Sequence, residues 1–123
     1  MTVHEILWID PDTLEASAII GDGEVQMRVY IPRYESGHSL EKIEIEALLT
    51  DNVILVDKDT PESVSFLRNG SYRSTVIGRV KSVEERTVEV GSFEIMLDEP
   101  LPGDANVGDK VKLDTARITM SII

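Results

Sequence analysis

The chain of 123 residues contains no cysteine, which excludes disulfide bonds and thiol catalysis. Histidine is nearly as scarce: His4 and His38 are the only two, and a zinc site normally takes three or four ligands. No G-x-G-x-x-G motif, phosphate-binding loop or glycine-flanked serine elbow occurs. No motif therefore specifies a reaction, and we predict neither a catalytic residue nor a cofactor.

Basic residues are also few, with 12 Lys and Arg against 23 Asp and Glu, which gives a net charge of −11. This balance argues against a nucleic-acid partner, because proteins that bind phosphate backbones concentrate Lys and Arg. With only 5% aromatic residues, a platform for stacking bases is also hard to find. One segment is locally basic, and it contains Arg68, Arg73, Arg79, Lys81 and Arg86. We interpret it as a solvated strand face balanced by acidic neighbours.

Long apolar runs are missing as well, and none approaches the roughly 20 residues needed to span a bilayer. The first residues, "MTVHEILWI", have no basic region and carry Glu5, which is not typical of a secretory leader. We therefore expect a soluble, cytoplasmic protein without a membrane span. The length and the 41% of hydrophobic residues predict one globular domain, residues 1–123.

What the sequence does contain is alternation of apolar and polar residues, which is typical of half-buried strands. The alternating segments are 24–31, 42–49, 74–83, 87–97 and 110–120. Gly78 interrupts one of them and suggests a bend or a bulge. Residues 39–50 can also be read as a helix that begins at Ser39, because Glu, Lys, Leu and Ala favour helices. We prefer the strand.

One segment has helix signals. In "TPESVSFLRNG" (60–70), Thr60 is a candidate N-cap and Pro61 would take the first helical position. The pair at 69–70, Asn-Gly, can adopt the left-handed conformation that ends a helix. We predict one short helix near 61–68.

Two pairs of segments read alike and suggest that the chain repeats one plan. Both 42–50 and 110–119 are lysine-led alternating runs that end in Thr. Residues 9–16 resemble 83–90 in the same way, so that pseudo-repeats would span 1–50 and 72–120. Internal duplication and convergence of short alternating strands both explain these similarities.

These patterns predict an all-β, mainly antiparallel fold, either a small barrel or a two-sheet sandwich. Glycine-rich turns at 21–23 and the proline-containing loop at 98–109 separate the strands. The stretch "IGRVKSVEERTVEVGSFEIML" (77–97), followed by "VGDKVKL" (107–113), resembles the OB-fold and SH3-like small barrels. The resemblance is limited to the second half of the chain and implies a fold only, since no binding residue can be carried over.

Two acidic segments share the pattern Asp-x-Asp-Thr-x-Glu, "DPDTLE" (10–15) and "DKDTPE" (57–62). Carboxylates at this spacing could bind a hard cation such as calcium or magnesium, although the pattern is not that of an EF-hand loop. The candidate ligands are Asp10, Asp12, Asp57 and Asp59. The alternative is that these residues form turns and helix caps. Paired carboxylates for glycoside hydrolysis are disfavoured in a chain so small and so poor in aromatic residues.

The first strand, "VHEILWI", is apolar on both faces, with Ile6 and Trp8 on one of them. Such a strand is either buried on both sides or lies at a contact surface. Trp8 and Ile6 are therefore our interface candidates, with the core as the alternative. We also expect both terminal strands to be paired, either with each other to close the barrel or with a second subunit.

Taken together, the sequence predicts a non-enzymatic β-barrel module for protein interaction or assembly, with a protein partner or self-association into a homo-oligomer. The first alternative is an acidic inhibitor or immunity-type protein that binds a basic partner, because clustered carboxylates steer such association. The second is a small carboxylate-based metal-binding protein. No particular small-molecule ligand is indicated.

Overall fold

The computed structural model describes residues 1–35, 42–67 and 71–123, and within them every regular element is a strand. The strands are β1 (Thr2–Asp10), β2 (Glu15–Gly21), β3 (Gln26–Ile31), β4 (Ile43–Val56), β5 (Ser63–Phe66), β6 (Ser74–Ser82), β7 (Thr87–Val90), β8 (Phe93–Leu97) and β9 (Lys110–Ile122). The described residues therefore include no helix long and apolar enough to cross a membrane. The predicted all-β class is confirmed.

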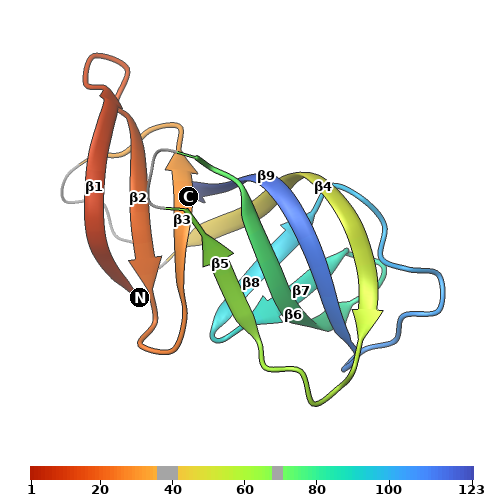
Figure 1. The fold of residues 1–123 in the computed structure, drawn as a ribbon. Helices are drawn as coiled ribbons and strands as arrows, with labels where there is room; N and C mark the ends of the chain where they lie inside the picture. The colour runs from red at the N-terminus through yellow and green to blue at the C-terminus, as the bar shows by residue number, and fades with distance from the viewer. Residues whose placement is uncertain (36–41, 68–70) are drawn as a thin grey trace.

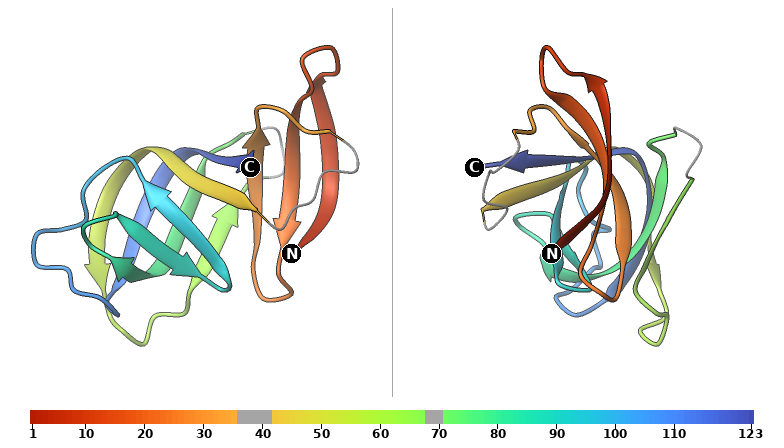
Figure 2. Two further views of the ribbon diagram at one scale, coloured as in Figure 1. Left: turned by 180° about the vertical axis from the view of Figure 1, so that it is seen from behind. Right: turned by 90° about the vertical axis from the view of Figure 1, so that its left-hand side faces the viewer.

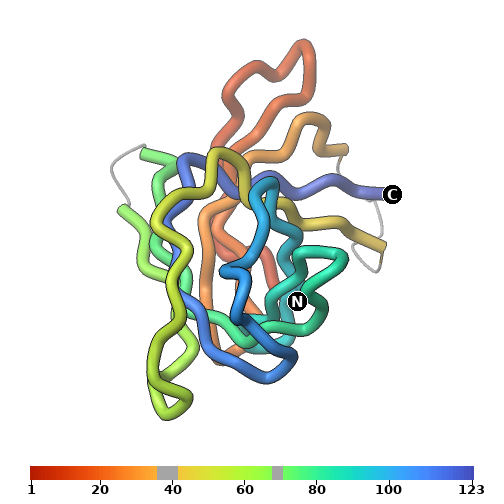
Figure 3. The backbone as a smooth tube through the Cα atoms, turned by 90° about the vertical axis from the view of Figure 1, so that its right-hand side faces the viewer, coloured from red at the N-terminus to blue at the C-terminus, as the bar shows by residue number. Residues whose placement is uncertain are grey.

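Five of the strands close into a barrel, in the order β4-β8-β7-β6-β9 and back to β4 (Figure 1). The β6–β7, β7–β8, β6–β9 and β4–β9 pairs are antiparallel, whereas β4 and β8 run parallel through Glu46↔Met96 and Ala47↔Leu97. The short β5 pairs with β6 on the same edge as β7. Figure 3 views the molecule from the barrel side. The predicted small barrel is confirmed.

Strands β1, β2 and β3 form an antiparallel meander that stands beside the barrel, and β1 lies outermost (Figures 1 and 2). The meander joins the barrel where Tyr30 of β3 pairs in parallel with Thr119 of β9. The strand β9 is long enough to pair with β6 in its first half and with β3 near its end. Among the described residues, one nine-stranded sheet therefore runs from β1, at its end, around the barrel.

A single hydrophobic core extends from the barrel to the inner face of the meander. The largest fully buried side chains include Ile20, Met27, Ile31, Ile95, Leu113, Ile118 and Met120. The loop over 98–109 contributes Leu101 and Ala105 to the same cluster, so it covers part of the core. Continuity of the core explains why the meander stays with the barrel although few backbone pairs join them.

The two lysine-led segments are strands, as predicted, and they pair with each other. Ile45 lies opposite Met120 and Ala47 opposite Ile118, all four buried. Residues 39–41 lie outside the described residues, but from 43 onward the helical alternative is wrong. The reason is that β4 obtains backbone partners on both edges, β9 and β8, which a helix would not provide.

The predicted helix near 61–68 is wrong for the residues that the structure describes. Ser63–Phe66 is the strand β5, which pairs antiparallel with β6 from Ser63↔Ile77 to Phe66↔Ser74. The turn before it is closed by the Thr60 amide, which donates to the carbonyl of Asp57 at 2.9 Å. A helix this short gains little without packing, whereas the Ser-Val-Ser-Phe alternation fits an available sheet edge.

Gly78 does not mark a bulge, because the irregularity in β6 lies between Val80 and Ser82. Its small size serves close packing instead: a Cβ there would lie 2.9 Å from the carbonyl oxygen of Glu89 and 3.0 Å from Val90 Cγ2. The glycine allows two barrel strands to approach without a side chain between them.

The terminal strands are both paired but not with each other, so that part of the prediction is wrong. β9 closes the barrel through β4 and β6, and the amide of Ile123 donates to the carbonyl of Lys42 at 2.9 Å. β1 pairs with β2 and is separated from β9 by two strands.

Candidate functional site

The outer edge of β1 is the most unusual surface of the described structure. In the part of the chain that the structure describes, β2 is the only strand that pairs with β1, and β1 is the last strand of the sheet. Leu7, Trp8 and Ile9 follow one another on this strand, and they are 52%, 47% and 49% exposed. Because successive side chains of a strand point to opposite faces, Leu7 and Trp8 expose apolar surface on both faces of this terminal strand, which suits contact with another chain. We call these three residues and their strand edge the β1 edge.

The two interface candidates have different environments. Ile6 lies opposite Ala18 and packs, half-buried, against the hydrophobic core. Trp8 lies opposite Ala16 on the same face, but it is not part of the core cluster. Its ring is 5.9 Å from the ring of Tyr34, at a tilted angle of 57°. Ile6 therefore ties the edge to the core, and Trp8 remains accessible on it.

Local hydrogen bonds hold the end of the β1–β2 hairpin in place. The amide of Asp12 donates to Asp10 Oδ1 at 2.9 Å, which forms a side-chain turn. Leu14 has a positive φ of 65°, and its carbonyl accepts the Tyr34 amide at 2.9 Å. That bond fixes the position of the ring against which Trp8 packs.

A second contact anchors the hairpin to the barrel. The phenol of Tyr30 donates to Glu15 Oε2 at 2.7 Å, and this hydrogen bond raises the pKa of the Tyr30 phenol. The guanidinium of Arg117, on β9, lies 4.3 Å from the centroid of the Tyr30 ring, and the Tyr72 ring meets it edge-on at 6.1 Å. Side-chain contacts thus link β2 through β3 to β9, and they fix the strand that pairs with β1 to the barrel.

The aspartates that were candidate metal ligands serve turns. Asp57 Oδ1 accepts the amide of Asp59 at 2.9 Å, in the same arrangement as the Asp10 and Asp12 pair. The two segments lie on different elements, the first after β1 and the second after β4. Among the described residues, no three His, Asp or Glu side chains come together in a way that could hold a metal ion.

Asp22, at the β2–β3 turn, connects the meander to the β7–β8 turn of the barrel. Its Oδ2 accepts the amide of Ser92 at 2.7 Å and the Ser92 hydroxyl at 2.8 Å, while Oδ1 accepts the amides of Glu24 and Val25. Partial burial raises the pKa of Asp22, but these hydrogen bonds outweigh it and hold the pKa well below its ordinary range. We call this contact the Asp22 clasp.

Asp98 holds β4 to the end of β8. Its carboxylate accepts the amide of Leu49 at 2.6 Å and both the amide and the hydroxyl of Thr50. Burial raises the pKa of Asp98, but these hydrogen bonds outweigh it and lower the pKa. Leu49 has a positive φ of 52°, so the carboxylate satisfies backbone amides at an irregular point of the strand.

Asp114 is a further carboxylate with a structural role. Its two oxygens accept the side chains of Asn52 at 3.1 Å and Thr75 at 2.8 Å, which lowers its pKa. It thereby links three neighbouring strands, β4, β9 and β6.

Two residues of the basic segment, Arg79 and Lys81, are paired with acidic side chains. Arg79 Nη2 lies 3.0 Å from Glu89 Oε2, and Lys81 forms an ion pair with Glu94. Arg86 donates to the carbonyl of Asp98 at 3.1 Å. Arg68 and His38 lie outside the described residues, and His4 is exposed on β1.

A solvent-open hollow of about 520 Å³ lies between the start of β3 and β5, lined by residues 24–26 and 62–66. Its acidic members are Glu24 and Glu62, and Glu62 Oε1 accepts the amide of Gly91 at 3.2 Å. Lys110 Nζ lies 3.8 Å from Glu62 Oε2. We assign no ligand to this hollow, because the carboxylate of Glu62 is already engaged within the molecule.

Sequence reasoning singled out Trp8 and Ile6 and placed Leu7 and Ile9 on the opposite face of the strand, but it missed the contact between Trp8 and Tyr34. The alternation of "VHEILWI" showed two apolar faces, yet it could not show which strand would be the last in the sheet. The Asp22 clasp was also missed, because Asp22 and Ser92 are distant in the chain and each reads as an ordinary turn residue.

In comparisons with known proteins, the chain matches no family model, no curated protein and no solved structure. Its function is therefore argued from its own geometry.

Proposed function

We propose that this protein is a non-enzymatic interaction module that binds another protein through the β1 edge. One observation carries the proposal: the last strand of the described sheet, nine residues long, presents Leu7, Trp8 and Ile9 half-exposed and in succession. Strand edges of soluble proteins are commonly protected by lysine, proline, short length or bulges. β1 has no lysine or proline and is nine residues long, and its irregularities lie near its ends and leave the stretch from Glu5 to Trp8 regular. An added strand would gain backbone hydrogen bonds, and the exposed side chains would supply specificity.

The barrel serves in this proposal as a rigid support, and we infer that it is of the OB type. An SH3 barrel is an antiparallel meander, whereas β4 here runs parallel to β8. Read from β6, the order is a three-stranded meander, a parallel step to β4, and β9 closing back onto β6. This is the OB arrangement with its last strand moved to the front of the chain.

The outer face of β7 and β8 supports contact through β1 rather than nucleic-acid binding. In OB proteins that bind oligonucleotides, this region of the barrel carries stacking aromatics and basic groups. Here Glu89 and Glu94 occupy it, and they neutralise Arg79 and Lys81. The meander, which is additional to the barrel, carries the run of three successive exposed apolar residues, Leu7, Trp8 and Ile9.

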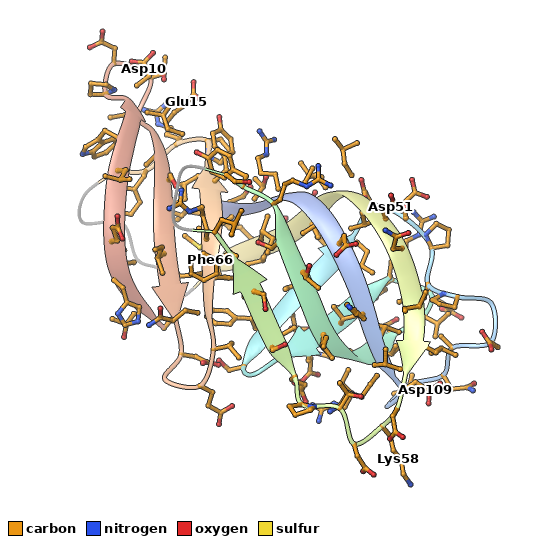
Figure 4. All side chains as sticks on the ribbon, in the orientation of Figure 1. Asp10, Glu15, Asp51, Lys58, Phe66 and Asp109 are labelled. Atoms are coloured by element: carbon orange, nitrogen blue, oxygen red, sulfur yellow. The ribbon has the colours of Figure 1, made fainter. Side chains whose placement is uncertain are left out.

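The distribution of charge favours this proposal over an acidic inhibitor. Such an inhibitor is expected to gather its carboxylates on one face. Asp10 lies at the tip of the meander, while Asp51 and Asp109 lie toward opposite ends of the barrel (Figure 4). The acidity is thus spread over the molecule, which fits solubility and repulsion between copies better than recognition of one basic surface.

An affinity-capture experiment with matched variants tests the proposal. Leu7→Lys places a charge at the centre of the β1 edge, and Leu49→Lys makes the same change at a barrel position that is 75% exposed. Immobilised wild type and Leu49→Lys should retain the same protein from a lysate of the native host, and Leu7→Lys should lose it. Equal retention by all three, with circular dichroism showing that all are folded, would refute binding through this edge.

A further inference from the structure

The β1 edge is regular only in its middle. Register shifts between Val3 and Glu5 and between Trp8 and Asp10 interrupt the pairing of β1 with β2 near both ends. The stretch from Glu5 to Trp8 is therefore the part of β1 whose backbone is regular enough for a further ladder. Of its four residues, only Glu5 is charged.

We infer that the occupant of this edge is a second copy of the chain, paired antiparallel with β1 about a twofold axis at Leu7. The inference rests on the proposed function and names its partner. Residues directly opposite in an antiparallel pair must lie on the same face of the sheet, so the axis must pass through a residue and not between two. Within the regular stretch, the axis can pass through Ile6 or Leu7 and still keep three residues of each strand paired.

The two registers differ in what they bring together. An axis at Leu7 places Leu7 opposite the partner's Leu7, and Ile6 opposite the partner's Trp8 on both sides of the axis. An axis at Ile6 places the Glu5 carboxylate opposite the partner's Leu7. Over the three paired residues, only the first register brings apolar side chains opposite each other at every position, and Glu5 then lies beyond them, opposite the partner's Ile9. Opposite apolar pairs stabilise neighbouring strands.

The exposed surface is large enough for a weak dimer and too small for a permanent one. The exposed portions of Leu7, Trp8 and Ile9 amount to roughly 300 Å² per copy, given typical side-chain areas. With the short backbone ladder, the total buried area stays near the lower limit of specific interfaces, about 1,000 Å². We therefore expect weak, reversible association that depends on concentration.

The net charge of the chain predicts a salt dependence that distinguishes this dimer from a complex with a basic partner. Each copy carries a net charge of −11, so two copies repel each other at low ionic strength. Added salt screens this repulsion, and the self-association should strengthen. Binding of a basic partner would weaken under the same change, because salt screens attraction.

Sedimentation velocity and cysteine cross-linking test the inference together. The average mass of the wild type should rise with concentration from 13.7 kDa toward twice that value, and more so at high salt. Leu7→Lys should remain monomeric, and Leu49→Lys should behave as the wild type. The chain has no cysteine, so Leu7→Cys introduces the only thiol, opposite its own copy at a Cβ separation of about 4.5–5.5 Å. Under mild oxidation it should form a covalent dimer at least about tenfold faster than Leu49→Cys.

Two results would overturn the dimer. One is a wild type that stays monomeric at every concentration and salt, and the other is equal cross-linking by Leu7→Cys and Leu49→Cys. The cysteine variants keep the test valid if Leu7→Lys fails to fold. If the dimer fails while affinity capture still depends on Leu7, the edge binds a different protein and the proposed function stands. If capture fails as well, the proposed function falls with the dimer.

Discussion

Replacing Asp22 by asparagine should loosen the meander from the barrel and destabilise the whole domain. The carboxylate accepts two hydrogen bonds from its own turn and two from Ser92. Asparagine can keep an oxygen toward the turn amides, but its amide nitrogen then faces the N–H of Ser92. The rotatable Ser92 hydroxyl can adapt to this donor, whereas the backbone amide cannot.

The loss amounts to one charge-assisted hydrogen bond with its amide left unpaired, together with weakening of a second. Such bonds contribute about 1.5–3 kcal/mol each, so Asp22→Asn should lower the free energy of unfolding by about 2–3 kcal/mol at pH 7. With a urea m-value of about 1.5 kcal/mol/M, the midpoint should fall by about 1.5–2 M. Glu24→Gln is the matched control, since it removes the same charge from an exposed side chain two residues away.

The effect should depend on pH in a definite direction. The pKa of Asp22 is lower in the folded protein than in the unfolded chain, where a carboxyl titrates near about 3.9. Its contribution is therefore complete above that pH and is lost as the pH falls toward the folded pKa. Urea unfolding from pH 7 down to pH 2 should show the gap between wild type and Asp22→Asn narrowing below about pH 4. A gap under about 0.5 kcal/mol at pH 7, or one independent of pH, would refute the clasp as a stabilising contact.

Three further predictions follow from the barrel. Deleting residues 118–123 removes the buried Ile118 and Met120 and the part of β9 that pairs with the start of β4, so thermal melts followed by circular dichroism should show loss of cooperative folding. A truncated protein that melts at the wild-type temperature would contradict barrel closure by β9. Gly78→Ala should lower the free energy of unfolding by about 1–3 kcal/mol through overpacking, as measured by urea unfolding. Gly103→Ala, where an added Cβ meets no atom within 4 Å, should be close to neutral, and equal effects of the two substitutions would refute the packing argument. Asp98→Asn should cost about 1–3 kcal/mol at pH 7 and progressively less below about pH 4, and a loss that does not change with pH would exclude the lowered pKa as its origin.

Much of the architecture could be predicted because alternation is a local property. Ile45 and Ala47 on one strand, and Ile118 and Met120 on another, are spaced by two and are all buried. Those patterns identified the strands that form the barrel wall, and the glycine and proline clusters marked the connections between them.

The helix near 61–68 failed because local capping signals competed with an unseen partner. Thr60 and Pro61 are well suited to start a helix, but Val64 lies opposite Val76 of β6 and packs against the core. Whether a sheet edge is available there depends on how residues far along the chain fold. Tertiary pairing therefore decided the outcome over local propensity.

The β1 edge could be predicted only in part, for a similar reason. The sequence showed that Ile6 and Trp8 share an apolar face, but the order of strands determines which face is covered and which edge is free. Tyr34 is fixed by the carbonyl of Leu14, a backbone contact that leaves no mark in the sequence. The Asp22 clasp could not be predicted either, because Asp22 and Ser92 are far apart in the sequence and come together only in the folded chain.

Site-specific photo-cross-linking in the native host would test the central claim most directly. A photoreactive amino acid at position 7 would lie on the β1 edge, and one at position 49 would lie on the barrel at a still more exposed position. The account predicts a covalent adduct with a protein, the same chain or another, from position 7 and not from position 49. No adduct from position 7, or adducts of equal yield from both positions, would contradict the claim that this protein works through the β1 edge.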